Sequence, residues 1–242
     1  MRVMLTIALE KPTLPRDYRP LIRRLLESML EQYGGSDMLK KHYNATPSSH
    51  AFSVYLPKCI FKGNIQLSSG YIKIIFSTCD KQVYDDFFAA AQHTLQKGFE
   101  ISENTFTITA IVPVPEKHIE SSTIRLRMLS PLIVQDASNT EARSTGGCLS
   151  IGDVGFSDAF RHSVSATLQD TSVPPEEIAD LLLTPCEDEA ACKETHILHK
   201  GRFYKTTLGM LRLSGEPRIL NLLYQNGIGE LRDEGFGLFE LA

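Results

Sequence analysis

The sequence predicts an α+β fold made of two tandem domains, and three observations support this prediction. Each half of the 242-residue chain has the same order of expected elements, β-α-β-β-α-β. Short alternating runs of apolar and polar residues predict the strands, and longer runs with helical spacing predict the helices. A polar, proline-containing stretch at 113–121 separates two expected strands. The pattern therefore favours two ferredoxin-like, RRM-like domains, residues 1–117 and 118–242.

The first half contains six expected elements in this order. Residues 2–9 alternate like a strand, and three prolines then interrupt the chain before a helical pattern at 21–30. Pro20 is well placed at the first turn of that helix because proline has no amide hydrogen to lose there. The remaining elements are predicted as strands at 51–56 and 70–77, a helix at 83–97 and a strand at 105–112.

The second half repeats the order without any detectable sequence repeat. A strand starts near Ser122, and a helical pattern covers 156–168. Strands at 195–199 and 203–213, a helix at 217–225 and a strand at 235–241 complete the set. The polar segments 136–147 and 170–194 are expected to be surface insertions.

Composition places the chain among ordinary globular proteins of the cytoplasm. Its hydrophobic content is 42% and its charged content 22%. No apolar run approaches the roughly 18 residues of a membrane-spanning helix, and residues 1–10 are strand-like and too short for a signal peptide. Five cysteines, an odd number without regular spacing, indicate free thiols in a reducing compartment. We expect a cytoplasmic protein with no membrane partner.

The tail of the chain carries the most specific motif. Gly227-Ile-Gly229 and Gly235-Phe-Gly237 flank five mostly polar residues. Glycine admits positive φ, and successive amides in such a turn form a concavity that suits phosphate, so the motif predicts an anion-binding loop. It matches neither the dinucleotide fingerprint nor the P-loop. A purely structural turn from helix to strand is the alternative; it explains Gly227 as a helix cap but not the other three glycines.

This tail resembles the CRISPR repeat-processing endoribonucleases, the Cas-six family of the RAMP superfamily. The preceding residues 205–224 are similar to that family's last strand and helix, and 124–134 resemble its strand that ends in a Ser-Pro step, here Ser130-Pro131. The resemblance covers roughly the second half of the chain. It implies two ferredoxin-like domains, no cofactor, and CRISPR repeat RNA as partner, both as precursor and as mature crRNA. Other Cas proteins of an effector complex are further candidate partners.

The resemblance also implies a catalytic histidine between the first helix and the second strand. His42, within Lys40-Lys41-His42-Tyr43-Asn44, is the first candidate, and His50, just before Phe52-Ser53, is its rival. Metal-free RNA cleavage needs a base, an acid and a group that stabilises charge, and histidine serves as base or acid near neutral pH. Tyr33 is a candidate partner, and Lys41 or Lys58 a candidate for stabilising charge. Surface or packing roles without catalysis remain open for all of these.

RNA binding must use a local basic patch, because the net charge is −4. Arg232 is the only basic residue between the glycine pairs, beside Glu230, Asp233 and Glu234. The other candidates are pairs on a helix (Arg23, Arg24), at a hairpin turn (Arg202, Lys205) and on one strand face (Arg125, Arg127), with Lys41 beside His42. For each pair a solvated surface without RNA is the alternative.

Two further readings of the sequence compete with cleavage. A related protein that binds repeat RNA without cutting it would lack a histidine at the scissile phosphate, and an enzyme for a small phosphorylated ligand would have a closed pocket. Cys186, Cys192, His196 and His199 contain zinc-binding side chains, but their spacing is off pattern, so no metal is predicted. Whether the protein is a monomer or a homodimer is left open by the sequence.

Overall fold

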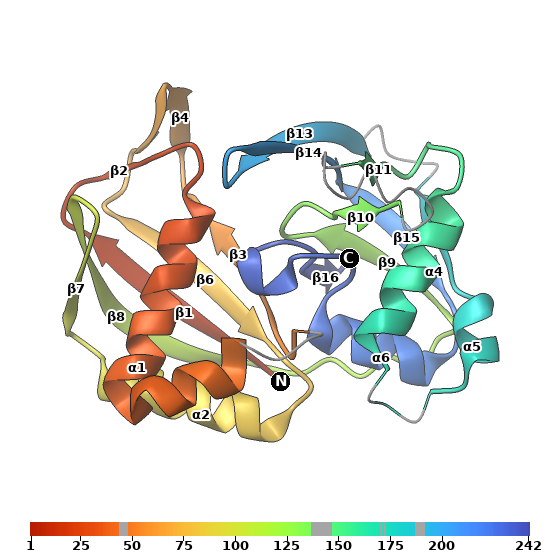
Figure 1. Cartoon of the computed structure of the whole chain (residues 1–242), viewed down its shortest axis with the longest axis horizontal. Helices are drawn as coiled ribbons and strands as arrows, with labels where there is room; N and C mark the ends of the chain where they lie inside the picture. The colour runs from red at the N-terminus through yellow and green to blue at the C-terminus, as the bar shows by residue number, and fades with distance from the viewer. Residues whose placement is uncertain (44–47, 137–146, 170, 172, 187–191) are drawn as a thin grey trace. The chain divides into compact units, whose positions relative to one another are not determined.

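The computed structural model describes residues 1–43, 48–136, 147–169, 171, 173–186 and 192–242, and Figure 1 shows its ribbon. The chain forms two compact units. The first comprises Met1–Glu116 with Asp233–Gly235, and the second Lys117–Arg232 with Phe236–Ala242. The short segment Asp233–Gly235 therefore packs with the first unit although it belongs to the glycine-rich tail.

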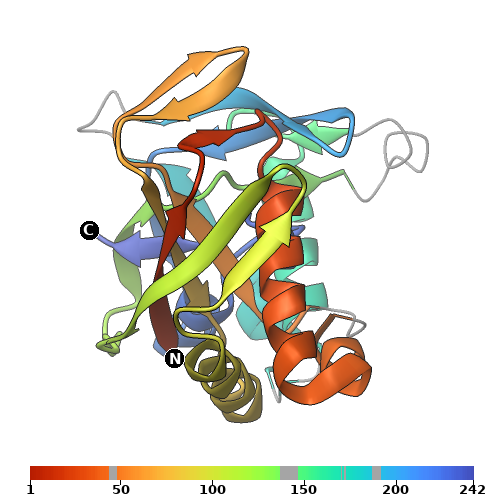
Figure 2. The ribbon, with the colours of Figure 1, turned by 90° about the vertical axis from the view of Figure 1, so that its left-hand side faces the viewer.

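The first unit contains a five-stranded antiparallel sheet of order β3-β6-β1-β8-β7, in which β1 and β8 lie side by side (Figure 2). Every second residue of β1, including Val3, Leu5 and Ile7, is fully buried, because alternate side chains of a strand face one side. Without β7, the order β3-β6-β1-β8 is that of a ferredoxin-like domain, as predicted. The strands are β1 (Arg2–Leu9), β3 (Ala51–Tyr55), β6 (Tyr71–Ser77), β7 (Gly98–Ile101) and β8 (Asn104–Val114).

Two helices belong to this unit, α1 (Arg19–Tyr43) and α2 (Lys81–His93). Helix α1 is much longer than the predicted 21–30, and it kinks at Gly35, whose φ is 71°. Helix α2 begins at Asp80, whose carboxylate accepts hydrogen bonds from the amides of Gln82 and Val83. It ends before the predicted 97, at Thr94, whose amide donates to Ala90.

A small three-stranded sheet of order β2-β5-β4 was not predicted. Its strands β2 (Thr13–Leu14), β4 (Cys59–Lys62) and β5 (Asn64–Leu67) are two to four residues long. Runs this short do not establish a period in the sequence. Strand β7 was missed for the same reason.

The second unit has a four-stranded antiparallel sheet of order β12-β15-β9-β16, again the ferredoxin-like order. Its core includes Leu126, Leu211, Leu213 and Phe239, all fully buried. The strands are β9 (Thr123–Met128), β12 (Leu182–Pro185), β15 (Met210–Ser214) and β16 (Phe239–Leu241), and the helices α4 (Phe156–Thr167), α5 (Pro175–Ala179) and α6 (Pro217–Asn226).

Two small pairs of strands complete this unit: β10 (Val134–Gln135) with β11 (Cys148–Leu149), and β13 (Lys193–His199) with β14 (Arg202–Leu208). The predicted strand 203–213 is in fact two strands in different sheets, separated at Gly209, whose φ is 127°. The predicted strand 235–241 shortens to β16 because Gly235 and Gly237 have positive φ. Much of the predicted insertion at 136–147 lies outside the described residues; the other, 170–194, includes α5 and β12.

None of the helices in the described part of the chain is long and apolar enough to cross a membrane.

Candidate active site and nucleic-acid interface

The two candidate catalytic histidines line one narrow cavity in the first unit, which is too small to admit a water molecule. His42 comes from the last turn of α1, and His50 from the residue before β3. Both are buried, with 3% and 1% of their surface exposed. The alternative of a surface-loop histidine is therefore wrong for both: the extension of α1 carries His42 inward, and β3 carries His50 against the sheet. The cavity walls are completed by Leu30, Tyr43, Phe76, Val83 and Phe87.

His42 forms a dyad with Asp86 of α2. Its Nε2 lies 3.1 Å from Asp86 Oδ2, and the Lys41 ammonium donates to the same oxygen at 2.8 Å. Burial lowers the pKa of His42 and outweighs the opposing effect of Asp86, so the imidazole is neutral at pH 7. A neutral ring that donates from Nε2 to Asp86 leaves the lone pair on Nδ1. That nitrogen is buried and makes no hydrogen bond to any described residue.

His50 is held by aromatic rings. Its imidazole stacks on Phe76, with ring centroids 5.1 Å apart, and meets the Tyr43 ring edge-on at the same distance. The Tyr43 hydroxyl is itself buried and has no hydrogen-bond partner among the described residues. Burial raises the pKa of Tyr43, so the phenol keeps its proton. This wall of the cavity thus presents one imidazole and one protonated phenol.

The structure does not join Tyr33 or Lys58 to these histidines. Tyr33 precedes the kink of α1, is 43% exposed, and lies beside His93 with ring centroids 5.8 Å apart. The Lys97 ammonium lies 3.1 Å from Nε2 of the same His93. Lys58 stands at the start of the β4–β5 hairpin with φ of 43°. Lys41 is the one candidate cation that shares a hydrogen-bonding partner with His42 in the described part of the chain.

Asp86 and Tyr43 were missed by the sequence analysis. Asp86 lies 44 residues after His42, in the middle of a helix whose other carboxylate, Asp85, points to Lys81. No local pattern distinguishes the two aspartates. Tyr43 could have been found, because it directly follows His42 and an aromatic beside a histidine is a common cavity wall.

Arg23 connects α1 to the tail segment that packs with this unit. Its guanidinium forms ion pairs with Glu27, Asp233 and Glu234, the last of these within a short hydrogen bond. It also lies 4.9 Å from the centre of the Tyr43 ring, at the cation–π distance. Arg23 therefore stabilises the acidic tail and supports Tyr43, so the alternative of a merely solvated helix residue is wrong, and its RNA contact stays a prediction.

Replacing Arg23 with glutamine is expected to lower the free energy of unfolding by about 1–3 kcal/mol, since it leaves Asp233 and the buried Glu234 without this cation. Partial exposure of Arg23 keeps the effect below that of a fully buried pair. Urea unfolding followed by circular dichroism measures it. Arg24→Gln, on the exposed side of the same helix, is the matched control; an equal effect of both variants would contradict the structural role of Arg23.

The glycines of the tail are required by positive φ and, at three of the four, by the close approach of other atoms. Gly227, Gly229, Gly235 and Gly237 all have positive φ. A Cβ on Gly229 would lie 2.3 Å from the carbonyl oxygen of Ile133, and one on Gly237 would lie 1.9 Å from that of Ile228. A Cβ on Gly235 would meet the Phe52 ring at 2.8 Å. The structural alternative thus explains all four glycines.

Hydrogen bonds tie the loop to the Ser-Pro strand end. The amide of Gly237 donates to the Pro131 carbonyl, that of Glu230 to Ile133, and that of Leu238 to the Ser130 hydroxyl. The Gly227 and Ile228 amides are also engaged, by Leu223 and Gly237. The two sequence motifs are therefore halves of one structural unit. Four amides of the loop that were expected to face an anion, those of Gly227, Ile228, Glu230 and Gly237, are used internally.

Arg232 also differs from expectation. It is 4% exposed and donates to the carbonyl of Asn226, the last residue of α6. It begins the short helix η1 (Arg232–Glu234). In this structure its guanidinium caps a helix rather than facing solvent, because a cation stabilises the partial negative charge of a helix C-terminus.

The remaining basic candidates lie in the second unit. Arg125 and Arg127 occupy the exposed face of β9, where Arg127 pairs with Glu240 and Arg125 is in register with Arg212. Arg202 is exposed beside the Lys200-Gly201 turn, whose two positive φ angles suit a tight hairpin.

Lys205 lies further along the same hairpin than expected. It pairs with Asp153 at 2.6 Å and Glu194 at 3.1 Å. These hydrogen bonds raise the pKa of Lys205, so the ammonium keeps its proton, and the two carboxylates offset its charge. Lys205 therefore offers less to an anion than Arg202 does.

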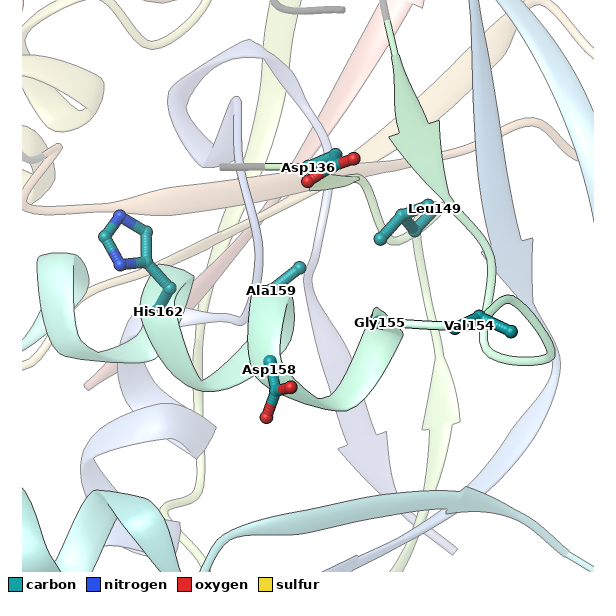
Figure 3. Close-up of a pocket in the computed structure, with 7 residues that line it drawn as sticks. All are labelled: Asp136, Leu149, Val154, Gly155, Asp158, Ala159 and His162. Carbon is teal, nitrogen blue, oxygen red and sulfur yellow. The ribbon is translucent and has the colours of Figure 1, made fainter. Parts of the chain in front are cut away.

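One surface pocket of the second unit, lined by Asp136, Asp158 and His162, does not resemble a metal site. Figure 3 shows Asp158 and His162 on helix α4, with the Asp158 carboxylate pointing away from Asp136. Asp158 pairs with Arg161. Across the described residues, no three His, Cys, Asp or Glu side chains are arranged to hold a metal ion. Burial raises the pKa of Cys148 to about 11, so this thiol remains protonated at neutral pH.

Solved structures with the same fold cover essentially the whole chain. One is described as a Cas6-related gene from Pyrococcus furiosus (TM-score 0.83, 19% identity), aligned over 100% of this chain and 98% of that one. Another is described as an RAMP protein binding different RNA substrates. It has a TM-score of 0.82 and 18% identity, aligned over 100% of this chain and 99% of that one. A third is described as a Cas6 product complex. It has a TM-score of 0.73 and 14% identity, aligned over 100% of this chain and 99% of that one. No curated protein matches the sequence.

A protein-family model supplies the assignment. The model for the C-terminal part of CRISPR associated protein Cas6 matches residues 114–241, more than half of the chain. The matched region contains both the Ser-Pro step and the glycine-rich loop that hydrogen-bonds to it. The chain therefore belongs to the Cas6 family of CRISPR-associated proteins.

Proposed function

We propose that this protein is a CRISPR repeat-processing endoribonuclease that binds the precursor transcript and cleaves within the repeat without metal. The ribose 2′-OH attacks the adjacent phosphorus and leaves a 2′,3′-cyclic phosphate and a 5′-hydroxyl. Membership of the Cas6 family supports RNA processing as the general role. The observation that carries the chemistry is the His42–Asp86 dyad with its neutral imidazole.

In the proposed reaction His42 acts as the base. Its Nδ1 takes the 2′-OH proton as the oxygen attacks phosphorus, and the imidazolium that forms is stabilised by Asp86. The departing 5′-oxygen takes a proton from the acid, for which His50 is the candidate because it lines the same cavity. Lys41, which already contacts Asp86, is the nearest assigned cation for the charge on the phosphorane. Tyr33 and Lys58 remain alternative candidates for acid and charge stabilisation.

The proposed mechanism requires that the RNA can reach the buried His42. The cavity is too narrow for water, and a ribose must reach Nδ1 for proton transfer. The cavity therefore has to open when RNA binds. Catalytic hydrogen bonds form only in the substrate complex in many enzymes, so a closed cavity in the free protein is compatible with the mechanism.

A second function is favoured by the same burial. A protein that holds repeat RNA without cutting it needs no accessible histidine, and here both candidates are at most 3% exposed. In that case the two histidines serve packing, with His50 between Tyr43 and Phe76. The two functions share repeat RNA as partner and differ only in cleavage.

Incubation of the purified protein with repeat RNA in EDTA tests the proposal. We expect cleavage at one position in the repeat and, by mass spectrometry, a 2′,3′-cyclic phosphate on the upstream fragment, because no metal is needed for attack by the 2′-OH. Binding without cleavage would replace the proposal with the non-catalytic function. Loss of cleavage in EDTA with recovery in Mg²⁺ would overturn the mechanism.

A further inference from the structure

The β4–β5 hairpin of the first unit exposes apolar side chains on a well-anchored framework. Ile60 and Phe61 of β4 have 52% and 60% of their surface exposed. On β5, Ile65 and Leu67 are buried and fix the hairpin to its unit. In Figure 1 the strand labelled β4 projects beyond the upper end of helix α1 of the same unit. Ile60 and Phe61 are consecutive in β4, so their side chains face opposite sides, and Phe61 stands on the face of its partner Ile65.

Backbone contacts hold both ends of the hairpin. Strand β5 pairs with β2, and the amide of Leu67 donates to the Pro12 carbonyl. At the base, the amide and hydroxyl of Ser68 both donate to the Lys58 carbonyl. The position of Phe61 therefore requires little ordering when a ligand binds, which favours affinity.

The chain segment that contains the hairpin carries charge of one sign. Between residues 38 and 79 the chain has five lysines and no aspartate or glutamate, although its overall net charge is −4. Two of these lysines, Lys58 and Lys62, flank the exposed apolar residues and are themselves exposed. None of the ion pairs in the described part of the chain involves either of them. The hairpin thus presents two exposed cations beside an exposed aromatic ring, which is the kind of local positive charge that RNA binding by a chain of net charge −4 requires.

We infer that this hairpin binds single-stranded RNA, with a base stacked on the Phe61 ring and Lys58 and Lys62 in contact with phosphates. This inference rests on the proposed function, because it assigns a site for the RNA that the protein processes. An exposed aromatic between cations, without sequence-reading polar groups, suits unpaired nucleotides, since every base has a π-face. A double helix would hide those faces.

The charge argues against a second copy of this chain as the occupant. Strand β4 is the edge of its sheet and could in principle pair with another strand. Lysines at or beside both of its ends would then bring like charges together across an antiparallel pair, and edge lysines are a recognised device against strand addition. RNA instead supplies the opposite charge.

The test uses a fluorescein-labelled single-stranded RNA of about 12 nucleotides, within the site size of such platforms. Phe61→Leu keeps an apolar cover over Ile65 but removes the aromatic face, and it is expected to weaken binding by about 5- to 100-fold. Lys62→Ala is expected to reduce the slope of log K against log salt by about 0.7, the value for one phosphate contact on a single strand. Leu95→Ala and Lys81→Ala, exposed elsewhere in the same unit, are the matched controls.

The outcomes separate this inference from the proposed function. Unchanged binding by both hairpin variants, with wild-type cleavage of repeat RNA, would overturn the hairpin site alone. Weaker binding by the variants, with no cleavage by the wild type, would support the site and remove the catalytic proposal. Unchanged RNA binding with a lower sedimentation coefficient for Phe61→Leu would identify a protein contact and overturn the inference. Circular dichroism of each variant confirms that the fold is retained.

Discussion

Replacing His42 with alanine is expected to reduce the single-turnover rate of repeat RNA cleavage by about 10²- to 10⁴-fold while leaving RNA affinity within a few-fold of wild type. The reason is that the proposed base is lost, whereas binding uses other residues. The measurement is cleavage of end-labelled repeat RNA in EDTA at saturating protein. His118→Ala, an exposed histidine in the second unit, is the control and is expected to cleave at the wild-type rate.

The pH dependence provides a second readout for His42. A base must be unprotonated, and burial lowers the pKa of His42 below its ordinary value of 6.5. On the acidic side of the pH–rate profile, the cleavage rate therefore falls as the pH decreases through the pKa of His42, which lies below 6.5. Asp86→Asn removes the negative charge that favours the imidazolium, so we expect this acidic side of the profile to move to still lower pH together with a lower rate.

The free energy of unfolding should also decrease as the pH falls, because of the same His42 side chain. Because the folded pKa of His42 is lower than the unfolded one, the unfolded state binds more protons between those two values. The free energy of unfolding thus decreases as the pH falls below about 6.5. His42→Ala should reduce this dependence of the free energy of unfolding on pH.

Wild-type cleavage rates in His42→Ala, in His50→Ala and in the double variant would refute the proposed chemistry.

Replacing Gly237 with alanine is expected to destabilise the second unit by about 3–5 kcal/mol. The new Cβ would lie 1.9 Å from the Ile228 carbonyl oxygen, and backbone cannot move aside as the end of a flexible side chain can. The φ of +70° adds strain for any residue with a Cβ. Relief of either problem breaks the hydrogen bond from the Ile228 amide to the Gly237 carbonyl.

Thermal unfolding followed by circular dichroism measures this effect, with an expected decrease in Tm of roughly 10 °C or more. Gly152→Ala is the matched control, because Gly152 is in the same unit, does not have positive φ, and has no atom within 4 Å of an added Cβ. Its Tm should stay close to wild type. A Gly237→Ala variant as stable as Gly152→Ala would show that the loop does not depend on this close approach.

The β-α-β-β-α-β order was predictable in the first half because its main elements are long enough to show their period. In the second half one strand was wrong: the predicted strand 195–199 lies in the separate β13-β14 sheet, and the second strand of the four-stranded sheet is the short β12, inside the predicted insertion. Strand β1 alternates over eight residues, and α6 is bounded by Pro217 and Gly227, so local sequence suffices for both. The errors occurred where local patterns are short or tertiary packing prevails. Strands β4 and β5 have four residues each, and the run 203–213 bends at Gly209 into two sheets.

The candidate site shows the same division. From the sequence alone came the family resemblance, the two histidines and the glycine motif, because these depend on residue type and spacing. Only the tertiary structure decided that Asp86 contacts His42, that Arg232 caps α6, and that the Ser-Pro step binds the glycine loop. Each of these contacts joins residues that no local sequence pattern connects. The fold brings them together through the packing of whole helices and strands. Burial, which sets the pKa of His42, is likewise a property of that packing and not of the residue's neighbours in the chain.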